Sequence, residues 1–221
     1  MTALIGGSMA FDTIMVFQDQ FKNHILPDQV HILNVSFLVP EMRRNFGGCA
    51  GNIAFNLHML GGDGLPMGTV GDDFEPYARW LEQQHVRQDA IKSIAGTFTA
   101  QAYITTDQDD NQITAFHPGA MNAAHENRVT DVDGVTLGMV SPDGRQGMID
   151  HAEQFAEAGI PFIFDPGQAM PLFNKDDLAA HGVDMVLYPL TATRAMNVNS
   201  RAPTPKIPQA TRNSVHVGWY S

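Results

Sequence analysis

The sequence is poor in cysteine, in positive charge and in long apolar runs, and each shortage bears on the class of protein. Cys49 is the one cysteine in 221 residues, which excludes a framework of intramolecular disulfides. Lysine and arginine number 13 against 24 aspartates and glutamates, and the net charge of -11 argues against nucleic-acid binding, which depends on clustered cations. No stretch approaches the roughly 18 apolar residues of a membrane span, and residues 1–12 lack the charged start of a signal peptide. We therefore expect a cytoplasmic globular protein with no nucleic-acid or membrane partner.

What the sequence does contain is an alternation of short apolar runs with helical patterns. Apolar residues recur at helical spacing from Gly51 until Gly61 and Gly62 end the pattern, and Asp72 or Asp73 is placed to cap a second helix. Strands are expected at residues 3–7, 65–70, 135–140, 161–165 and 183–187, and further helices around residues 74–81 and 148–155. Strands and helices in turn predict an α/β fold whose parallel sheet is covered on both faces.

Three other segments are predicted to form strands. Residues 31–39, HILNVSFLV, alternate too weakly for a core strand but suit a half-exposed one in a smaller sheet. Residues 99–106 and 112–116 are rich in β-forming side chains, and DQDDN between them is typical of a hairpin turn. We expect these two runs to pair as a hairpin.

The composition changes sign near residue 190. Residues 190–221 contain four cations and no aspartate or glutamate, although the whole chain is acidic. Pro203, Pro205 and Pro208 lie within six residues of one another and oppose a regular helix or a central strand. We expect this tail to be irregular and to stay outside the sheet.

The segment NFGGCAGNIAFNLHMLGG, residues 45–62, places small residues directly before the first predicted helix. One interpretation is a ligand site, in which the missing or minimal side chains at Gly47, Gly48, Ala50 and Gly51 let a ligand approach the backbone. The helix would then direct its first N–H groups toward that ligand. Asn52 would add a donor and an acceptor suited to a sugar hydroxyl. The other interpretation is that small residues only let the helix pack closely on the sheet, and glycine content alone does not separate the two.

The full spacing of this segment resembles the N-terminal signature of the ribokinase-like, pfkB-type carbohydrate kinases, which phosphorylate sugars and nucleosides. The matching positions are Gly47, Gly48, Ala50, Asn52, Ala54, Gly61 and Gly71. The resemblance covers about residues 1–189. Within the family, the sequence looks most similar to bacterial adenosine-kinase-like members. It implies a Rossmann-like α/β sandwich over residues 1–189 with a small β-sheet lid from about residues 13–45 and 97–118. It also implies that the chain is truncated on its C-terminal side, with residues 190–221 as a non-family tail.

The resemblance assigns substrate contacts to named side chains. Asp12, expected in the loop after the first strand, should accept hydrogen bonds from ribose hydroxyls, with Gly47, Gly48 and Asn52 completing the cradle; a turn or helix-cap role is the alternative. The aromatic rings of the lid give two further candidates. Phe37 on the lid strand and Phe116 on the hairpin could flank a nucleobase, although aromatic residues on strands more often belong to a core.

On the phosphate side the resemblance is incomplete. Asp165 ends a predicted strand where relatives place phosphates, and its alternative role is to cap the turn at Pro166 and Gly167. Relatives use ATP with Mg²⁺. They carry an N-x-x-E motif and a glycine-rich anion hole that ends in an aspartate, which takes the proton from the attacking hydroxyl. We find none of these motifs in the sequence, so no catalytic residue and no metal ligand is assigned.

The resemblance therefore predicts ATP-dependent phosphoryl transfer to a nucleoside or sugar hydroxyl, adenosine-kinase-like, with the 221-residue chain itself inactive. The alternatives are a ribokinase-type sugar kinase and a non-catalytic remnant that binds substrate or oligomerises, and a homodimer through the lid is left open. A dinucleotide-binding oxidoreductase is disfavoured because no G-x-G-x-x-G follows the first strand. As a hypothesis, residues 190–221 are a frame-shifted version of a longer kinase.

Overall fold

The computed structural model describes residues 1–25 and 34–167, together with Phe173 and Val183. The expected tail at residues 190–221 and most of the expected strand at 183–187 lie outside the described residues. Within the described part, no helix is both long enough and apolar enough to cross a membrane.

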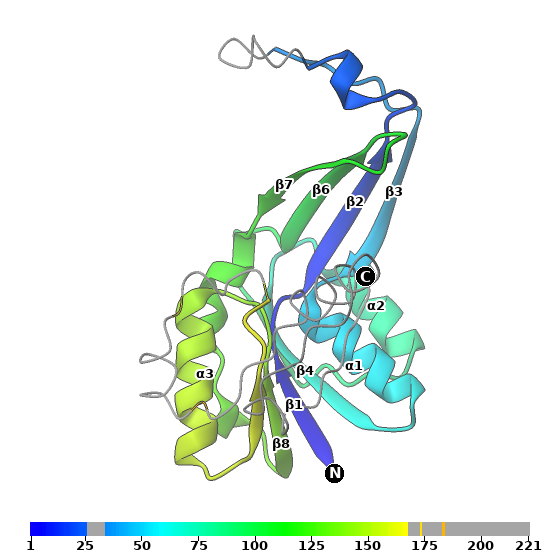
Figure 1. The fold of residues 1–221 in the computed structure, drawn as a ribbon. Coiled ribbons are helices and arrows are strands. Elements are labelled where there is room, and N and C mark those ends of the chain that lie inside the picture. The colour runs from blue at the N-terminus through cyan, green and yellow to red at the C-terminus, as the bar shows by residue number, and fades with distance from the viewer. Residues whose placement is uncertain (26–33, 168–172, 174–182, 184–221) are drawn as a thin grey trace, which may run out of the picture.

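The main sheet is parallel, and the described part of the chain contributes five strands to it in the order β5-β4-β1-β8-β9 (Figure 1). Its strands are β1 (Thr2–Gly6), β4 (Asp63–Val70), β5 (Ala90–Ser93), β8 (Val135–Val140) and β9 (Phe162–Phe164). All of its neighbouring strands are parallel. The expected strands at 3–7, 65–70, 135–140 and 161–165 are thereby confirmed with small shifts at their ends.

Helices cover both faces of this sheet. Helices α1 (Cys49–Met59) and α2 (Glu75–Gln83) lie on one side, and α3 (Arg145–Glu157) lies on the other with the 3-10 segments η3 (Gly119–Glu126) and η4 (Val129–Asp131) (Figure 1). Alternation along β1 serves both layers, because Leu4 packs in the core beneath α3 while Ile5 packs in the core beneath α1 and α2. The predicted α/β sandwich is confirmed.

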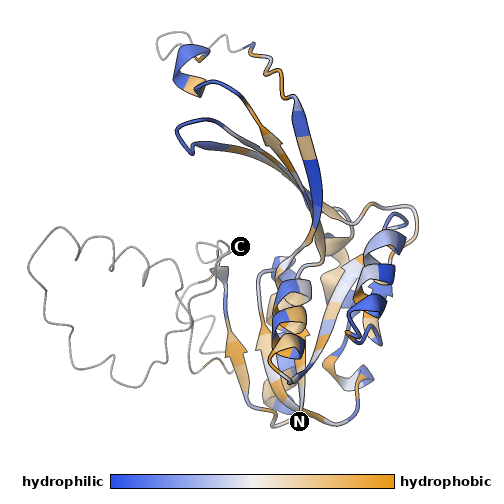
Figure 2. Cartoon of the chain, turned by 90° about the vertical axis from the view of Figure 1, so that its right-hand side faces the viewer, coloured by the Kyte–Doolittle hydropathy of each residue, from blue (hydrophilic) through white to orange (hydrophobic). Residues whose placement is uncertain are grey.

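A second, mixed sheet has the strand order β3-β2-β6-β7. It consists of β2 (Ala10–Val16), β3 (Glu41–Gly47), β6 (Ala100–Thr106) and β7 (Gln112–His117), and the 3-10 turn η1 (Phe21–Asn23) follows β2. The sheet projects from one end of the main sheet, with hydrophilic segments along its strands (Figure 2). The small sheet is confirmed, and it begins at Ala10.

Within residues 1–25 and 34–167, the chain passes between the two sheets four times, at β1–β2, β3–α1, β5–β6 and β7–η3. These crossings lie together where the two sheets meet (Figure 1). The meeting point is also the carboxyl end of β1 and β8. Because the chain goes from β1 to one side of the main sheet and later returns on the other side at β8, this point is the topological switch at which open α/β sheets bind ligands.

The strand expected at residues 31–39 is wrong over its described part. Residues 34–40 have no regular structure, and the strand that pairs with β2 is Glu41–Gly47. Phe37 instead packs against Phe17 and Phe21, with ring centroids 4.8 and 4.9 Å apart. Phe37 therefore belongs to an aromatic cluster and not to a strand face.

The predicted helix caps at Asp72 and Asp73 are also wrong. Helix α2 begins at Glu75 with Phe74 before it, and no side chain caps its first turn. Both carboxylates turn instead toward the segment that enters β6, where Asp72 accepts the N–H of Gly96 and Asp73 accepts the N–H of Thr99. The two carboxylates therefore accept backbone N–H groups, as capping residues do, but these groups belong to a neighbouring loop and not to α2.

Candidate substrate site at the junction of the two sheets

Asp12 lies within strand β2, and not in a loop as the sequence suggested. In the register of the small sheet, Asn45 of β3 and Ala102 of β6 are its direct neighbours, and Phe116 of β7 is the neighbour of Ala102. Residues paired in register share a face, so these four side chains form one row across the sheet. The row brings together a partly buried carboxylate and an aromatic ring that is 50% exposed.

The carboxylate of Asp12 occupies the space that a side chain at Gly47 would need. A Cβ built at Gly47 overlaps Oδ2 of Asp12. Burial raises the pKa of the Asp12 carboxyl. Gly47 is therefore required so that Asp12 can lie against the bare end of β3.

The turn into α1 is held by Ser8, and this corrects one sequence expectation. Gly48 has a φ of +89°, and a Cβ there would overlap the backbone of residues 8–10. The N–H groups of Cys49 and Ala50 donate to Oγ and the carbonyl oxygen of Ser8, at 3.1 and 3.0 Å. These first two helix N–H groups are thus used within the protein and are not directed at a ligand.

Gly51 also makes room for a protein group. A Cβ at Gly51 would overlap the hydroxyl of Tyr77, which donates a hydrogen bond of 3.0 Å to the carbonyl oxygen of Gly47. Gly47, Gly48 and Gly51 therefore accommodate Asp12, the β1–β2 turn and Tyr77. Each of the three glycines is thus in close contact with a group of the protein itself.

The remaining predicted substrate residues are placed differently from one another. Asn52 is exposed in the first turn of α1, and its amide has no hydrogen-bond partner among the described residues. Phe116 is on the same face of the small sheet as Asp12. Phe37 packs beside η1, away from this row, against Phe17, Phe21 and His24.

Two carboxylates lie at the carboxyl edge of the main sheet. Asp165 follows β9, and its Oδ1 accepts the N–H of Gly167 at 2.9 Å, which is the turn-capping contact considered as its alternative role. Asp143 follows β8, and its Oδ1 accepts the N–H of Gly144 at 2.9 Å. Burial raises the pKa of both carboxyl groups, that of Asp143 to about 7.

Sequence reasoning missed Asp143. Its side chain is buried, and within the described part its Oδ2 has no hydrogen-bond partner. The signal was present in the order Ser-Pro-Asp directly after the strand at residues 135–140, because side chains that follow a parallel strand gather at its carboxyl edge. Using that signal requires knowing that β8 lies beside β1.

Cys49 lies at the start of α1 in the field of these carboxylates. Burial, together with the negative charges of Asp165, Asp143 and Asp12, raises the pKa of its thiol to about 11. A thiol with this pKa is a packing residue and not a nucleophile at neutral pH.

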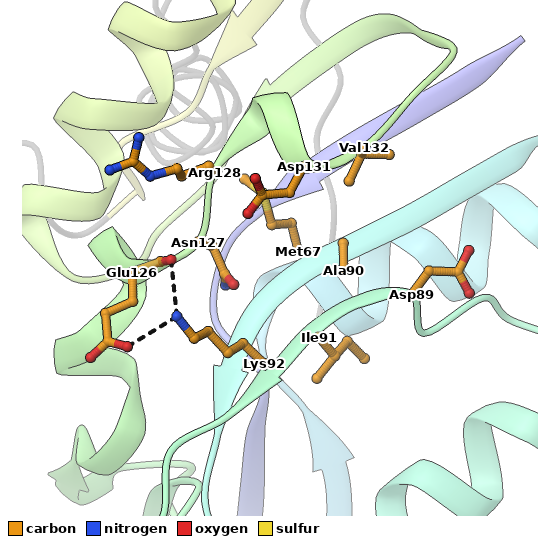
Figure 3. A pocket seen from close by; sticks show the side chains of 10 residues that line it. All are labelled: Met67, Asp89, Ala90, Ile91, Lys92, Glu126, Asn127, Arg128, Asp131 and Val132. Carbon is orange, nitrogen blue, oxygen red and sulfur yellow. Dashed lines mark hydrogen bonds and ion pairs between the residues drawn. The ribbon is translucent and has the colours of Figure 1, made fainter.

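A separate hollow of about 260 Å³ shares no lining residue with this site. It lies between β4, β5 and the segment that contains η4, and its lining includes Lys92, Asn127 and Asp131 (Figure 3). Nζ of Lys92 already contacts the carbonyl oxygen and Oε2 of Glu126, at 3.2 and 3.1 Å. The ammonium group of Lys92 is therefore paired within the protein.

Comparison with known proteins gives a consistent result. The family model for "pfkB family carbohydrate kinase" matches residues 10–186. A nucleoside kinase from Methanothermobacter thermautotrophicus is 28% identical over 183 residues, which are 80% of this chain and 59% of that protein. The chain spans about half the length of the curated relatives it matches.

The similar solved structures include complexes of the nucleoside kinase from Burkholderia thailandensis. The complex with inosine is 49% identical, has a TM-score of 0.70, and is matched over 82% of this chain and 57% of that chain. The complex with ADP-inosine is 52% identical with a TM-score of 0.67 and the same coverage.

Proposed function

This chain belongs to the pfkB family of carbohydrate kinases, and from that premise we propose that the row Asn45–Asp12–Ala102–Phe116 binds a purine nucleoside for ATP-dependent phosphorylation of one of its hydroxyls. The observation that carries the proposal is Asp12 itself. A carboxylate that is partly buried, placed in a rigid strand and fixed against Gly47 offers two acceptor oxygens to the vicinal hydroxyls of a ribose.

The geometry favours a nucleoside over a free sugar. Phe116 shares the face of Asp12 and is half exposed, so a base attached to a ribose at Asp12 has an aromatic ring within the same row. Asn52 supplies an unused amide at the start of α1. The inosine complex of the Burkholderia thailandensis enzyme supports a purine, and the sequence resemblance supports adenosine as well.

The phosphate donor is proposed only from similarity to other members of the family. The relative crystallised with ADP-inosine supports ATP as the donor. The described residues include no group of three or more His, Cys, Asp or Glu side chains that could hold a metal ion, so Mg²⁺ is implied by the family resemblance alone. Asp165 is proposed to lie near the phosphates, and its contact with Gly167 would then orient its carboxylate. We expect residues 1–221 alone to bind a nucleoside without phosphorylating it. Their sequence contains neither the N-x-x-E motif nor the aspartate that acts as the general base in relatives.

Calorimetry and a turnover assay test the proposal together. The 221-residue chain is titrated with inosine, adenosine, ribose and NAD, and is incubated at high concentration with radiolabelled ATP and each nucleoside. We expect binding of inosine and adenosine, weaker binding of ribose, and no phosphorylated product. Binding of NAD without binding of a nucleoside would contradict the assignment, and clear turnover would contradict the expected inactivity.

We also propose a homodimer through the small sheet. Its strands expose large apolar side chains on the face opposite to Asp12, with Met42 70%, Tyr103 44% and Ile113 43% exposed. Burying such side chains in a second copy would remove apolar area from water. Light scattering at several concentrations tests this, and a mass of one chain at all of them would contradict it.

A further inference from the structure

The turn after β4 joins the two sheets through one carboxylate, that of Asp73. Its Oδ1 accepts a hydrogen bond of 2.7 Å from the backbone N–H of Thr99, and its Oδ2 accepts one of 2.8 Å from Nε2 of Gln101. Nη2 of Arg44 lies 3.4 Å from the same Oδ2. Two side chains of the small sheet and one backbone N–H just before β6 therefore contact the same carboxylate, that of Asp73.

These partners stand on both sides of the strand that carries Asp12. Arg44 in β3 and Gln101 in β6 are the registered neighbours of the two β2 residues that flank Asp12. Adjacent residues of a strand point to opposite faces, so Arg44 and Gln101 lie on the face opposite to Asp12. The Asp73 carboxylate thus holds the strands on either side of Asp12 from behind.

The contacts of Asp73 differ in strength. The Asp73 side chain is 21% exposed and that of Arg44 is 44% exposed, so their ion pair contributes little because water screens it. Hydrogen bonds to an ionised carboxylate are stronger than neutral ones. The bonds from Thr99 and Gln101 therefore carry most of the interaction, while Arg44 is placed by its contact with the ring of Phe11, 3.7 Å away.

The same turn contains a second carboxylate, that of Asp72, whose contacts can be compared with those of Asp73. The N–H of Gly71 donates to Oγ1 of Thr99 at 3.0 Å, and a Cβ at Gly71 would overlap the backbone of residues 97–99. Asp72 accepts the N–H of Gly96 at 2.9 Å, which lies before β6 and outside the small sheet. Asp72 and Asp73 are thus neighbouring carboxylates, of which only Asp73 contacts the strands around Asp12.

We propose that Asp73 is a positioning residue that fixes strands β3, β2 and β6 over the carboxyl edge of the main sheet and so sets the distance between Asp12 and Asn52. Its effect on substrate binding rests on the proposed nucleoside function, whereas its effect on the placement of the sheets does not. The change Asp73→Asn removes the charge and turns an amide toward the donor of Gln101. The change Asp72→Asn removes the same charge from the same turn and serves as the matched control.

Spin-label distances measure the placement of the sheets directly. In the full chain with Cys49→Ser, cysteines replace the exposed Thr114 of β7 and the exposed Met59 at the end of α1. We expect Asp73→Asn to shift or broaden the distance distribution and Asp72→Asn to leave it as in the parent. Should Asp73→Asn fail to fold, Gln101→Met, which removes one donor and keeps the carboxylate, is expected to broaden the distribution as well.

Calorimetry with inosine completes the test in the chain with Cys49 intact. We expect Asp73→Asn to weaken inosine binding about tenfold, the loss typical of one charge-assisted contact, and Asp72→Asn to leave it unchanged. An unchanged distance distribution or an unchanged inosine affinity in Asp73→Asn overturns the proposal. If the parent chain binds no inosine, the proposed function fails, and the distances alone then decide the role of Asp73.

Discussion

Tyr77 donates its hydroxyl to the carbonyl oxygen of Gly47 at 3.0 Å, through space that the missing side chain of Gly51 leaves open. The contact joins α2 to the end of β3, directly behind the position where the Asp12 carboxylate lies. Burial raises the pKa of the Tyr77 hydroxyl, so it remains a hydrogen-bond donor at neutral pH. A helix on the main sheet thereby supports the base of the small sheet.

The change Tyr77→Phe should lower the free energy of unfolding by about 1–3 kcal/mol, because it leaves a buried carbonyl oxygen without its donor. Urea unfolding followed by circular dichroism measures this. Tyr103→Phe is the control, since Tyr103 is 44% exposed and its hydroxyl donates to Oε1 of Gln101. We expect the control to lose less than about 0.5 kcal/mol, and equal losses in the two variants would contradict the support given to Tyr77.

The change Gly47→Ala should displace the Asp12 carboxylate and weaken inosine binding by at least about tenfold, because the added methyl takes the space of Oδ2. Gly61→Ala is the matched control. Gly61 has a φ of +82° and nothing within 4 Å of its Cβ position, so the variant should lose about 1 kcal/mol of stability and no affinity. Inosine affinities that fall equally in both variants would show that Gly47 acts only on stability.

The sequence predicted the elements whose apolar residues repeat at a regular period, such as β1 and α1. It missed β3 because residues 41–45 are exposed and carry no apolar alternation. It expected a strand at residues 31–39, where Phe37 packs on Phe17 and Phe21, and no local pattern distinguishes such packing from a strand face. Side chains that pack across long sequence distances therefore decided where the strands of the small sheet lie.

The candidate site was predictable in part for the same reason. Asp12 and Gly47 were found because the glycine spacing resembles a family signature, although their mutual contact joins two strands that lie far apart in sequence. Asp143 and Asp73 have ordinary local contexts and gain their roles only from the strand order of the two sheets. Such residues are identified once the topology is known.

Asp143 should make the stability of the protein fall as pH rises. Burial raises the pKa of its carboxyl from 3.8 to about 7, so between these values the folded chain holds a proton that the unfolded chain releases. The free energy of unfolding from this group therefore decreases from about pH 4 to about pH 7 and is level above. Asp143→Asn cannot ionise, so the variant should gain stability relative to the parent across this window, on the order of 4 kcal/mol.

Urea unfolding of both proteins at several pH values measures that difference. Asp12 and Asp165 also have raised pKa values, but they titrate in the parent and in the variant, so the difference isolates Asp143. Parallel stability curves from pH 4 to pH 8 would contradict a buried, unpaired carboxyl at this position.

Cys49 should resist alkylation in the folded protein. With its pKa raised to about 11, its thiolate fraction at pH 8 is about 10²-fold lower than that of a free cysteine. Iodoacetamide should therefore react slowly with the native chain and quickly with the same chain in urea. A native rate equal to the rate in urea would show that the start of α1 is open to solvent.

The most direct test of the account is calorimetric titration of inosine and of its free base, hypoxanthine, into the parent chain and into Asp12→Ala. The account predicts that the parent binds inosine and that Asp12→Ala weakens this binding about 10- to 100-fold, as expected for losing hydrogen bonds to a charged acceptor, while hypoxanthine binding stays the same. Asp133→Asn, an exposed carboxylate in the turn before β8, should change neither titration. Equal weakening of inosine and hypoxanthine by Asp12→Ala would contradict the assignment of Asp12 to the ribose.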